Sequence, residues 1–203
     1  GTDIAGIQQR QTAIRELAPK LEWRQLLQAY GMSTEDNPAH LSALQQWLQE
    51  APFIRDKKWV ALAMILAPIW FVGALYLTYA MEWPWQAGII AVLPQLWILR
   101  KFLEQVNKIH QQTSKAEKVL AYYSKLIQHI EGETFTTEKL KTLQSLLQVD
   151  TGTASSSVKK LSYIIGQLNV RMNAFAIILN VIGLWDLYWV RRLEQWKAPH
   201  KDK

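Results

Sequence analysis

The chain has 203 residues, of which 49% are hydrophobic and 20% charged. This composition excludes a disordered or fibrous protein, and the absence of cysteine excludes disulfides, zinc ribbons, iron–sulfur ligation and thiolate catalysis. The net charge of +6 weakly favours a phosphate or anionic lipid partner, and the 10 tryptophans are several times the usual number.

Helical stretches precede the first strongly apolar run. Apolar residues at helical spacing predict helix over 3–30, with a break at Pro19 and a C-terminal cap at Gly31. A further helix is predicted from an N-cap at Asn37, followed by proline, to about Glu50. Its buried stripe consists of Leu41, Leu44, Trp47 and Leu48.

Two uncharged runs follow. Residues 59–81 correspond to about 34 Å of helix, enough to cross a hydrocarbon core of about 30 Å. Residues 83–99 would cover only about 25 Å. Basic residues flank the pair of runs at its two outer ends: Arg55, Lys57, Lys58, Arg100 and Lys101. A hairpin brings both of these basic clusters to the same side, which by the positive-inside rule is the cytoplasmic side.

We predict a transmembrane helical hairpin over 59–99, because aromatic residues also occupy the positions of a membrane-interface belt. Trp59 and Trp97 are expected near the cytoplasmic face, and Tyr79, Trp83 and Trp85 near the opposite face. The alternative is a helical hairpin buried in a soluble domain or dimer, since the second run is short and a proline interrupts each run.

The clearest periodicity comes after the hairpin. Apolar residues recur at alternating steps of four and three, which predicts one long helix over 102–131 with a heptad seam. The seam consists of Phe102, Val106, Ile109, Thr113, Ala116, Leu120, Tyr123, Ile127 and Ile130. A short helix is expected after Thr136 or Thr137, followed by a turn over 150–157.

A last long helix is predicted from about Ser156 to Lys197. Its uncharged middle, 172–185, is too short to span a bilayer and is expected to be a buried core segment. Asn169, Asn173 and Asn180 would share one face of this helix and fix its register against a neighbour; scattered, half-exposed amides are the alternative. No segment has the period of a strand, so the predicted fold class is all-α.

No constellation of residues predicts catalysis. None of the nine glycines is followed by lysine, so there is no P-loop, and the histidines lack metal-ligand spacing. Glu131 and Glu133 flank a turn and are interpreted as helix-end charges rather than an acid–base pair. We therefore predict no catalytic, cofactor-binding or metal-binding residue and no enzymatic activity of this segment itself.

Lysines cluster on the second half of the chain. They alternate with glutamates, which favours a solvated face, although contact with DNA phosphates is an alternative. The cluster consists of Lys115, Lys118, Lys125, Lys139, Lys141, Lys159 and Lys160.

Several runs resemble a known family. Residues 10–17, RQTAIREL, resemble the start of the helical core of the mismatch-repair MutS family. Later runs resemble more narrowly the membrane-anchored MutS-related ATPases of bacteria: 126–135, 154–161, 171–173, 179–180, 184–186 and 193–197. The resemblance extends over nearly all of the chain, and its strength lies in the order of these runs.

The resemblance implies a core and lever module, called domain III in mismatch-repair enzymes. It would link a DNA-contacting end to a C-terminal ABC-type ATPase, which would begin shortly after Lys203 and hold ATP and Mg²⁺. The chain departs from soluble MutS in three respects. It has no mismatch-reading domain, its turn over 149–155 is too short for a DNA clamp, and the hairpin 59–99 has no counterpart there.

The expected organisation is an N-terminal helical part, 1–58, an inserted hairpin, 59–99, and a lever hairpin, 100–203. The start at Gly1 and the absence of a signal-peptide pattern suggest a segment of a longer protein. We expect it to transmit nucleotide-driven motion at the bacterial cytoplasmic membrane, with its own ATPase domain, a second copy and double-stranded DNA as expected partners. The alternatives are a DNA-backbone-binding module, a membrane scaffold unrelated to any ATPase, and a cytoplasmic location.

Overall fold

A computed structural model describes residues 4–32, 38–82, 84–149 and 152–200, and helices account for nearly all of them. The helices are α1 (Ile4–Leu17), α2 (Leu21–Met32), α3 (Pro38–Gln49), α4 (Lys58–Ala80), α5 (Trp85–Thr113), α6 (Ala116–Glu131), α7 (Glu138–Ser145), α8 (Ala154–Asn169), α9 (Phe175–Gly183) and α10 (Trp185–Lys197). Two short antiparallel strands, β1 (Gln148–Val149) and β2 (Gly152–Thr153), form a ribbon that no sequence signal indicated. The all-α fold class is confirmed.

The chain forms two compact units. Unit 1 comprises 1–37 and 117–162, and unit 2 comprises 38–116 and 163–203. Each unit combines two separate stretches, so this division cuts across the expected segments 1–58, 59–99 and 100–203. Unit 1 contains ten Lys and Arg and ten Asp and Glu, so the whole excess of +6 belongs to unit 2.

In unit 1, the predicted break between the first two helices is present. α1 ends at Leu17 and α2 begins at Leu21, on either side of Pro19. Gly31 is not a cap, because α2 continues to Met32. Asn37, the predicted N-cap of the next helix, lies outside the described residues, and α3 begins at Pro38 as expected.

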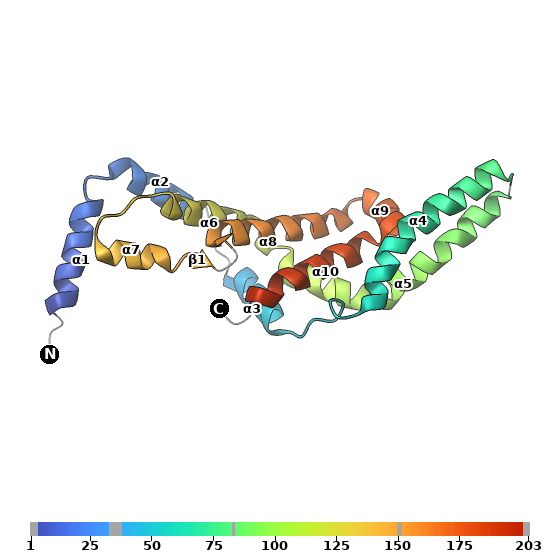
Figure 1. Ribbon diagram of the computed structural model, residues 1–203, viewed down its shortest axis with the longest axis horizontal. Coiled ribbons are helices and arrows are strands. Elements are labelled where there is room, and N and C mark those ends of the chain that lie inside the picture. The colour runs from blue at the N-terminus through green and yellow to red at the C-terminus, as the bar shows by residue number, and fades with distance from the viewer. Residues whose placement is uncertain (1–3, 33–37, 83, 150–151, 201–203) are drawn as a thin grey trace. The chain divides into compact units, whose positions relative to one another are not determined.

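Glutamates of unit 1 accept hydrogen bonds at the starts of two helices. The Glu16 carboxylate in α1 accepts the backbone N–H groups of Thr136 and Thr137 at 2.6 and 2.7 Å, just before α7, which lies beside α1 (Figure 1). Burial would raise the pKa of Glu16, but these hydrogen bonds outweigh it and lower the pKa to about 2. Glu131 at the end of α6 accepts the backbone N–H of Ser155 at 3.1 Å, and also its hydroxyl, at the start of α8.

The predicted single helix over 102–131 is wrong. α5 runs without interruption from the hairpin to Thr113, and α6 begins at Ala116. The buried Thr113 hydroxyl donates back to the carbonyl of Ile109 at 2.8 Å, a contact that bends helices, and the Ser114 carbonyl accepts the Asn169 amide at 3.2 Å. The predicted seam is nevertheless buried or half-buried along its whole length.

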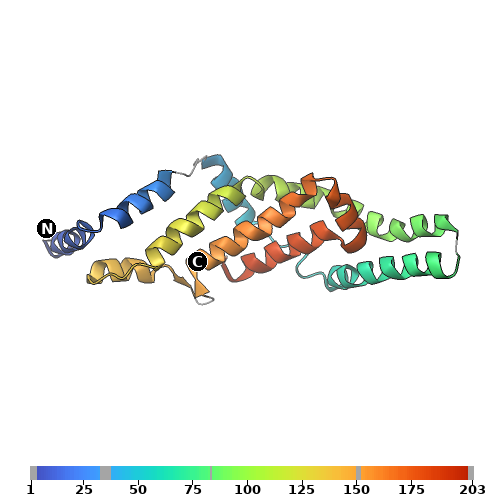
Figure 2. The ribbon, with the colours of Figure 1, turned by 90° about the horizontal axis from the view of Figure 1, so that it is seen from above.

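The predicted unbroken last helix is also wrong. α8 ends at Asn169, a 3₁₀ turn follows, and α9 leaves at a bend of 109°. A second break occurs at Leu184, whose left-handed backbone (φ 52°) is unusual for leucine and coincides with complete burial of its side chain. α10 then returns along the end of α8, where the Trp185 indole donates to the carbonyl of Gln167 at 3.2 Å (Figure 2).

Glu194 of α10 holds the connection between α3 and α4 in unit 2. Its carboxylate accepts the backbone N–H groups of Phe53, Ile54 and Arg55 at 2.8, 3.1 and 2.6 Å. Only 3% of this residue is exposed. A buried carboxylate is costly unless it is hydrogen-bonded, and here three donors from consecutive residues supply those bonds.

Lys197, one turn further along α10, holds the end of α3. Its ammonium donates to the carbonyls of Trp47 and Glu50, and it lies 4.7 Å from the centre of the Trp47 ring. Lys197 and Trp47 are 4% and 2% exposed. We call Glu194 and Lys197 together the α10 clamp, because they fasten the last helix to the residues that lead into α4.

The α10 clamp is testable by truncation of Glu194. We expect Glu194→Ala to lower the free energy of unfolding by about 3 kcal/mol, because one buried and two part-buried N–H groups lose a charged acceptor. Denaturant unfolding of the full chain in detergent, followed by circular dichroism, measures this. Glu104→Ala, an exposed glutamate of the same unit, is the control and should cost about 0.5 kcal/mol or less. Equal effects of the two substitutions would contradict a structural role of the clamp.

Candidate membrane interface

The two uncharged runs form an antiparallel helical hairpin made of α4 and the first half of α5 (Figure 1). The Trp70 indole of α4 donates to the carbonyl of Ala91 in α5 at 2.8 Å. Further toward the tip, a Cβ atom at Gly88 would lie 3.9 Å from the Thr78 hydroxyl, so the backbone of α5 lies close to α4 there. Among the described residues, α4 is long and apolar enough to span a bilayer, and α8 with α9 meets that criterion only as a bent pair.

Most apolar side chains of the hairpin are uncovered. Only 11% of the most apolar stretch of α4 is buried. We call the following exposed residues the hairpin surface: Leu62, Ile65, Leu66, Ile69, Val72, Leu75 and Tyr76 of α4, and Ile89, Ile90, Leu93 and Leu96 of α5. Between the helices lies an apolar cavity of about 590 Å³. Water-soluble monomers rarely expose a continuous apolar surface of this kind.

Cations and aromatic rings surround the base of the hairpin, the end where its basic residues lie. The Lys101 ammonium lies 5.3 Å from the ring centre of Trp59 and 5.4 Å from that of Trp97, and Lys57 lies 5.1 Å from that of Phe102. We call these five residues the collar. Such pairs are attractive, and Trp with Lys is typical of membrane–water interfaces.

The structure describes only some of the aromatic side chains that were expected at the two ends of the hairpin. Trp59 and Trp97 share the basic end, as predicted, because both contact Lys101. Tyr79 near the tip is 91% exposed. Trp83 lies outside the described residues, and only the backbone of Trp85 is described.

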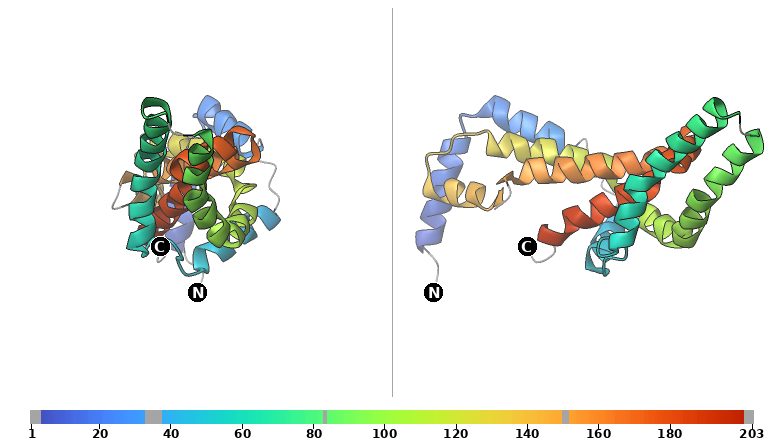
Figure 3. Two further views of the ribbon diagram at one scale, coloured as in Figure 1. Left: turned by 90° about the vertical axis from the view of Figure 1, so that its right-hand side faces the viewer. Right: turned by 45° about the vertical axis from the view of Figure 1, so that its right-hand side comes forward.

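The uncharged segment 172–185 is not buried throughout, contrary to prediction: most of its first half is exposed, whereas Ala176 and Leu184 are buried. Phe175, Ile177 and Ile178 of α9 are 73%, 70% and 55% exposed, and Met172 just before it is 75% exposed. Because the helix breaks on both sides of this segment, α9 lies against α4 and α5 beside the hairpin rather than inside a straight bundle (Figures 1 and 3).

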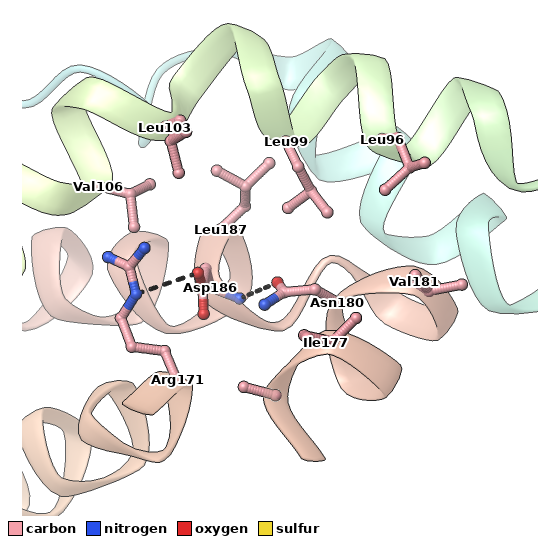
Figure 4. Close-up of a pocket in the computed structure, with 11 residues that line it drawn as sticks. Leu96, Leu99, Leu103, Val106, Arg171, Ile177, Asn180, Val181, Asp186 and Leu187 are labelled. Atoms are coloured by element: carbon pink, nitrogen blue, oxygen red, sulfur yellow. Dashed lines mark hydrogen bonds and ion pairs between the residues drawn. The ribbon is translucent and has the colours of Figure 1, made fainter. Parts of the chain in front are cut away.

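A cavity of about 250 Å³ lies where α9 meets α5 (Figure 4). Leu96, Leu99 and Leu103 line it from α5, and Ile177 and Val181 from α9. Arg171, Asn180 and Asp186 add polar groups to this mostly apolar lining.

Arg171 and Asp186 form an ion pair beside this cavity. Arg171 Nε lies 3.4 Å from Asp186 Oδ2, and the two side chains are 13% and 10% exposed. A second guanidinium nitrogen donates to Asn107 of α5 at 2.7 Å. Within the described part of the chain, Arg171 Nη1 and Asp186 Oδ1 are buried without a hydrogen-bond partner. The pair therefore links α5 to the start of α10. Loss of either charge would leave the other charge buried without a partner, which is strongly destabilising.

The neighbouring His110 of α5 is half-buried. Burial, and next the positive charge of Arg171, lower the pKa of His110 below its ordinary value. The surroundings of His110 therefore favour its neutral imidazole. None of these groups is arranged as a nucleophile with a base, so the cluster has the character of a structural junction.

The three asparagines do not share one helix face, because the helix that would carry them is broken. Asn169 donates to the carbonyl of Ser114, at the break between α5 and α6. Asn173 is exposed in the turn before α9. Asn180 accepts the backbone N–H of Asp186 at 2.9 Å and so caps α10. Asn169 and Asn180 thus fix the breaks rather than the register of a continuous helix.

The other residues considered for function lie mostly in unit 1. Glu131 bonds Ser155, and Glu133 forms an ion pair with Lys20. His129 stacks on Trp23 with ring centres 5.2 Å apart. All seven lysines of the predicted cluster are exposed. In the described residues, no three His, Asp or Glu side chains meet as metal ligands would.

Sequence reasoning missed the residues that hold unit 2 together. Glu194, Arg171 and Asp186 entered through family-like runs, and Lys197 also as the expected end of the last helix. Their signal was present: opposite charges three residues apart in the last helix, and single charges at the ends of an uncharged segment. The partners, at residues 47–55 and 107, are too distant in the sequence to be inferred from spacing.

Comparison with known proteins assigns no family, since no family model, curated protein or solved structure matches this chain. Function must therefore be inferred from the residues and their geometry.

The ion pair leads to a test with an internal comparison. We expect Arg171→Met to destabilise unit 2 by about 3 kcal/mol, because it leaves the Asp186 carboxylate buried without its partner. Arg171→Met combined with Asp186→Asn should cost clearly less, since no unpaired charge remains. Denaturant unfolding measures both variants, with Arg192→Met, an exposed arginine of α10, as the control. If the single and double variants are equally unstable, the charge pairing has no energetic importance.

Proposed function

We propose that the chain is the non-catalytic core and lever segment of a membrane-anchored, MutS-like ATPase. The hairpin 59–99 would hold it in the bacterial cytoplasmic membrane, with the remaining helices on the cytoplasmic side. The observation that carries the anchoring is the hairpin surface, which is long, uncharged and uncovered by protein.

Two further features support insertion into lipid over burial in a soluble core. A core helix of a soluble protein is mostly buried, whereas only 11% of the apolar stretch of α4 is. The charge is also suitably placed, because the net +6 belongs to the unit that contains the hairpin, and five basic residues lie at its base. Anionic lipid headgroups attract such juxtamembrane basic residues.

The α10 clamp supports the transmission role. α10 is the last long helix of the chain, and the proposed ATPase would follow it. Because Glu194 and Lys197 fasten α10 to residues 47–55, a displacement of α10 would move the base of the hairpin with it.

The support for a MutS-like parent is the order of the family-like runs. They begin with 10–17 in α1 and end with 193–197 in α10. On this proposal the parent chain contains a Walker A motif after Lys203, ATP and Mg²⁺ bind there, and the module works in a dimer. Recognition of mismatched DNA is not proposed.

The alternative of a DNA-backbone-binding module has one observation in its favour, the seven exposed lysines. Against it, unit 1, which holds six of them, has equal numbers of basic and acidic residues. Contacts with DNA phosphates weaken steeply with salt, so a gel-shift assay at low salt separates the two functions. Absence of retardation would contradict DNA binding.

Anchoring is tested by fractionation of the full-length protein. We expect the protein to stay in the membrane pellet after an alkaline carbonate wash. Ile65→Arg combined with Ile69→Arg should release it, because each arginine at the centre of a spanning helix costs about 3 kcal/mol. Leu143→Arg combined with Leu146→Arg, exposed leucines of unit 1, should leave it in the pellet.

A wild-type protein that is soluble and monodisperse without detergent would contradict the anchoring. In that case the hairpin is covered by protein, as the alternative of a buried hairpin requires.

A further inference from the structure

Helix α9 has one face on protein and one face uncovered. Its inner face includes Ala176, which is 2% exposed, and Asn180, which caps α10. The outer face carries Phe175 and Ile178, with Ile177 at its flank, all more than half exposed. These exposed side chains make few contacts within unit 2, so shortening them would remove almost no packing. The folding of unit 2 therefore does not explain why the outer face of α9 is apolar.

The position of α9 along the hairpin is fixed by its contacts with α5. Ile177 and Val181 line the same cavity as Leu96 and Leu99, and these two leucines are next to Trp97 and Arg100 in the sequence. α9 therefore lies at the level of the collar, not at the level of the tip. In a membrane, that level is the boundary between headgroups and acyl chains.

The dimensions of α9 suit that boundary and exclude a span. Its nine residues make a helix of about 14 Å, half of the hydrocarbon thickness. It contains no charged residue, and it leaves α8 at a bend of 109°. A short apolar helix that turns sharply away from the preceding helix can bury one face in the interface without crossing it.

We propose that α9 is a second membrane contact, an interfacial helix that inserts Met172, Phe175, Ile177 and Ile178 at the headgroup–acyl boundary of an anionic bilayer. This inference rests on the proposed insertion of the hairpin. Lipid is the occupant because α9 packs against both helices of the hairpin beside the basic collar, whereas a second copy of the chain would bring an equal cluster of positive charges against it.

The contact has a mechanical consequence. α9 joins the break after α8 to the start of α10, where the Asn180 cap and the Arg171–Asp186 ion pair lie. If lipid holds α9, the depth of this junction in the membrane is fixed. A movement of α10 then cannot rotate the hairpin without also displacing α9 from the lipid.

The absence of cysteine allows a direct test by single-site labelling. Full-length protein carrying Ile178→Cys is labelled with an environment-sensitive fluorophore and reconstituted in vesicles of equal parts phosphatidylcholine and phosphatidylglycerol. Brominated lipids with bromine near or far from the headgroup then quench the label by depth. Ile69→Cys, at the middle of α4, is the reference for a spanning helix, and Leu146→Cys, 75% exposed in unit 1, is the reference for an apolar residue away from lipid.

We expect the label at 178 to be quenched at least about twice as strongly by shallow as by deep bromine, in keeping with an insertion depth of roughly 5–10 Å. The label at 69 should show the opposite preference, and the label at 146 should not be quenched. If 69 is quenched and 178 is not, the interfacial role of α9 is wrong and the anchoring stands; cross-linking between copies through 178 would then identify it as a protein interface. If 69 is not quenched either, the proposed anchoring itself fails.

Discussion

One carboxylate, that of Glu194, sets the geometry on which unit 2 depends. Three consecutive backbone N–H groups point at it, and it is withdrawn from water, so the segment 53–55 can take only a narrow set of conformations. The Lys197 ammonium, one turn away, satisfies carbonyl groups near the end of α3 in the same way. Burying either charge alone would be unfavourable, and the backbone groups of 47–55 offset that penalty. The base of the hairpin is thereby fixed to α10.

This arrangement explains how a hairpin with little protein around it can still have a defined direction. α4 and α5 contact each other through small residues and the Trp70–Ala91 hydrogen bond, and at their base they contact α3, α9 and α10. Beyond the collar, most apolar side chains of the hairpin are exposed. In water such a surface would drive association, whereas in a bilayer it is the expected surface of a spanning helix. The α10 clamp and the Arg171–Asp186 ion pair of unit 2 are formed by residues outside the segment 59–99.

Local patterns predicted the elements, and tertiary contacts decided where they break. The charge-free length of α4, the break at Pro19 and the buried seam from Phe102 onward follow from composition and periodicity alone. The ends at Thr113, Asn169 and Leu184 do not, because they depend on bonds such as Asn169 to Ser114. The segment 172–185 was predicted to be buried for a related reason. An uncharged run has the same sequence pattern whether protein or lipid covers it, and the bends on both sides of α9 leave one face of that helix without protein cover.

The central claim is that a hairpin clamped to α10 crosses the bilayer with its base on the cytoplasmic side. The most direct test is labelling of single cysteines with a membrane-impermeant maleimide in intact cells and in inverted vesicles. Met81→Cys, at the exposed tip, and Asp56→Cys, at the exposed base, are the two positions. The claim predicts that position 81 is labelled only from outside the cell and position 56 only from inside. Labelling of both positions from the same side would contradict it.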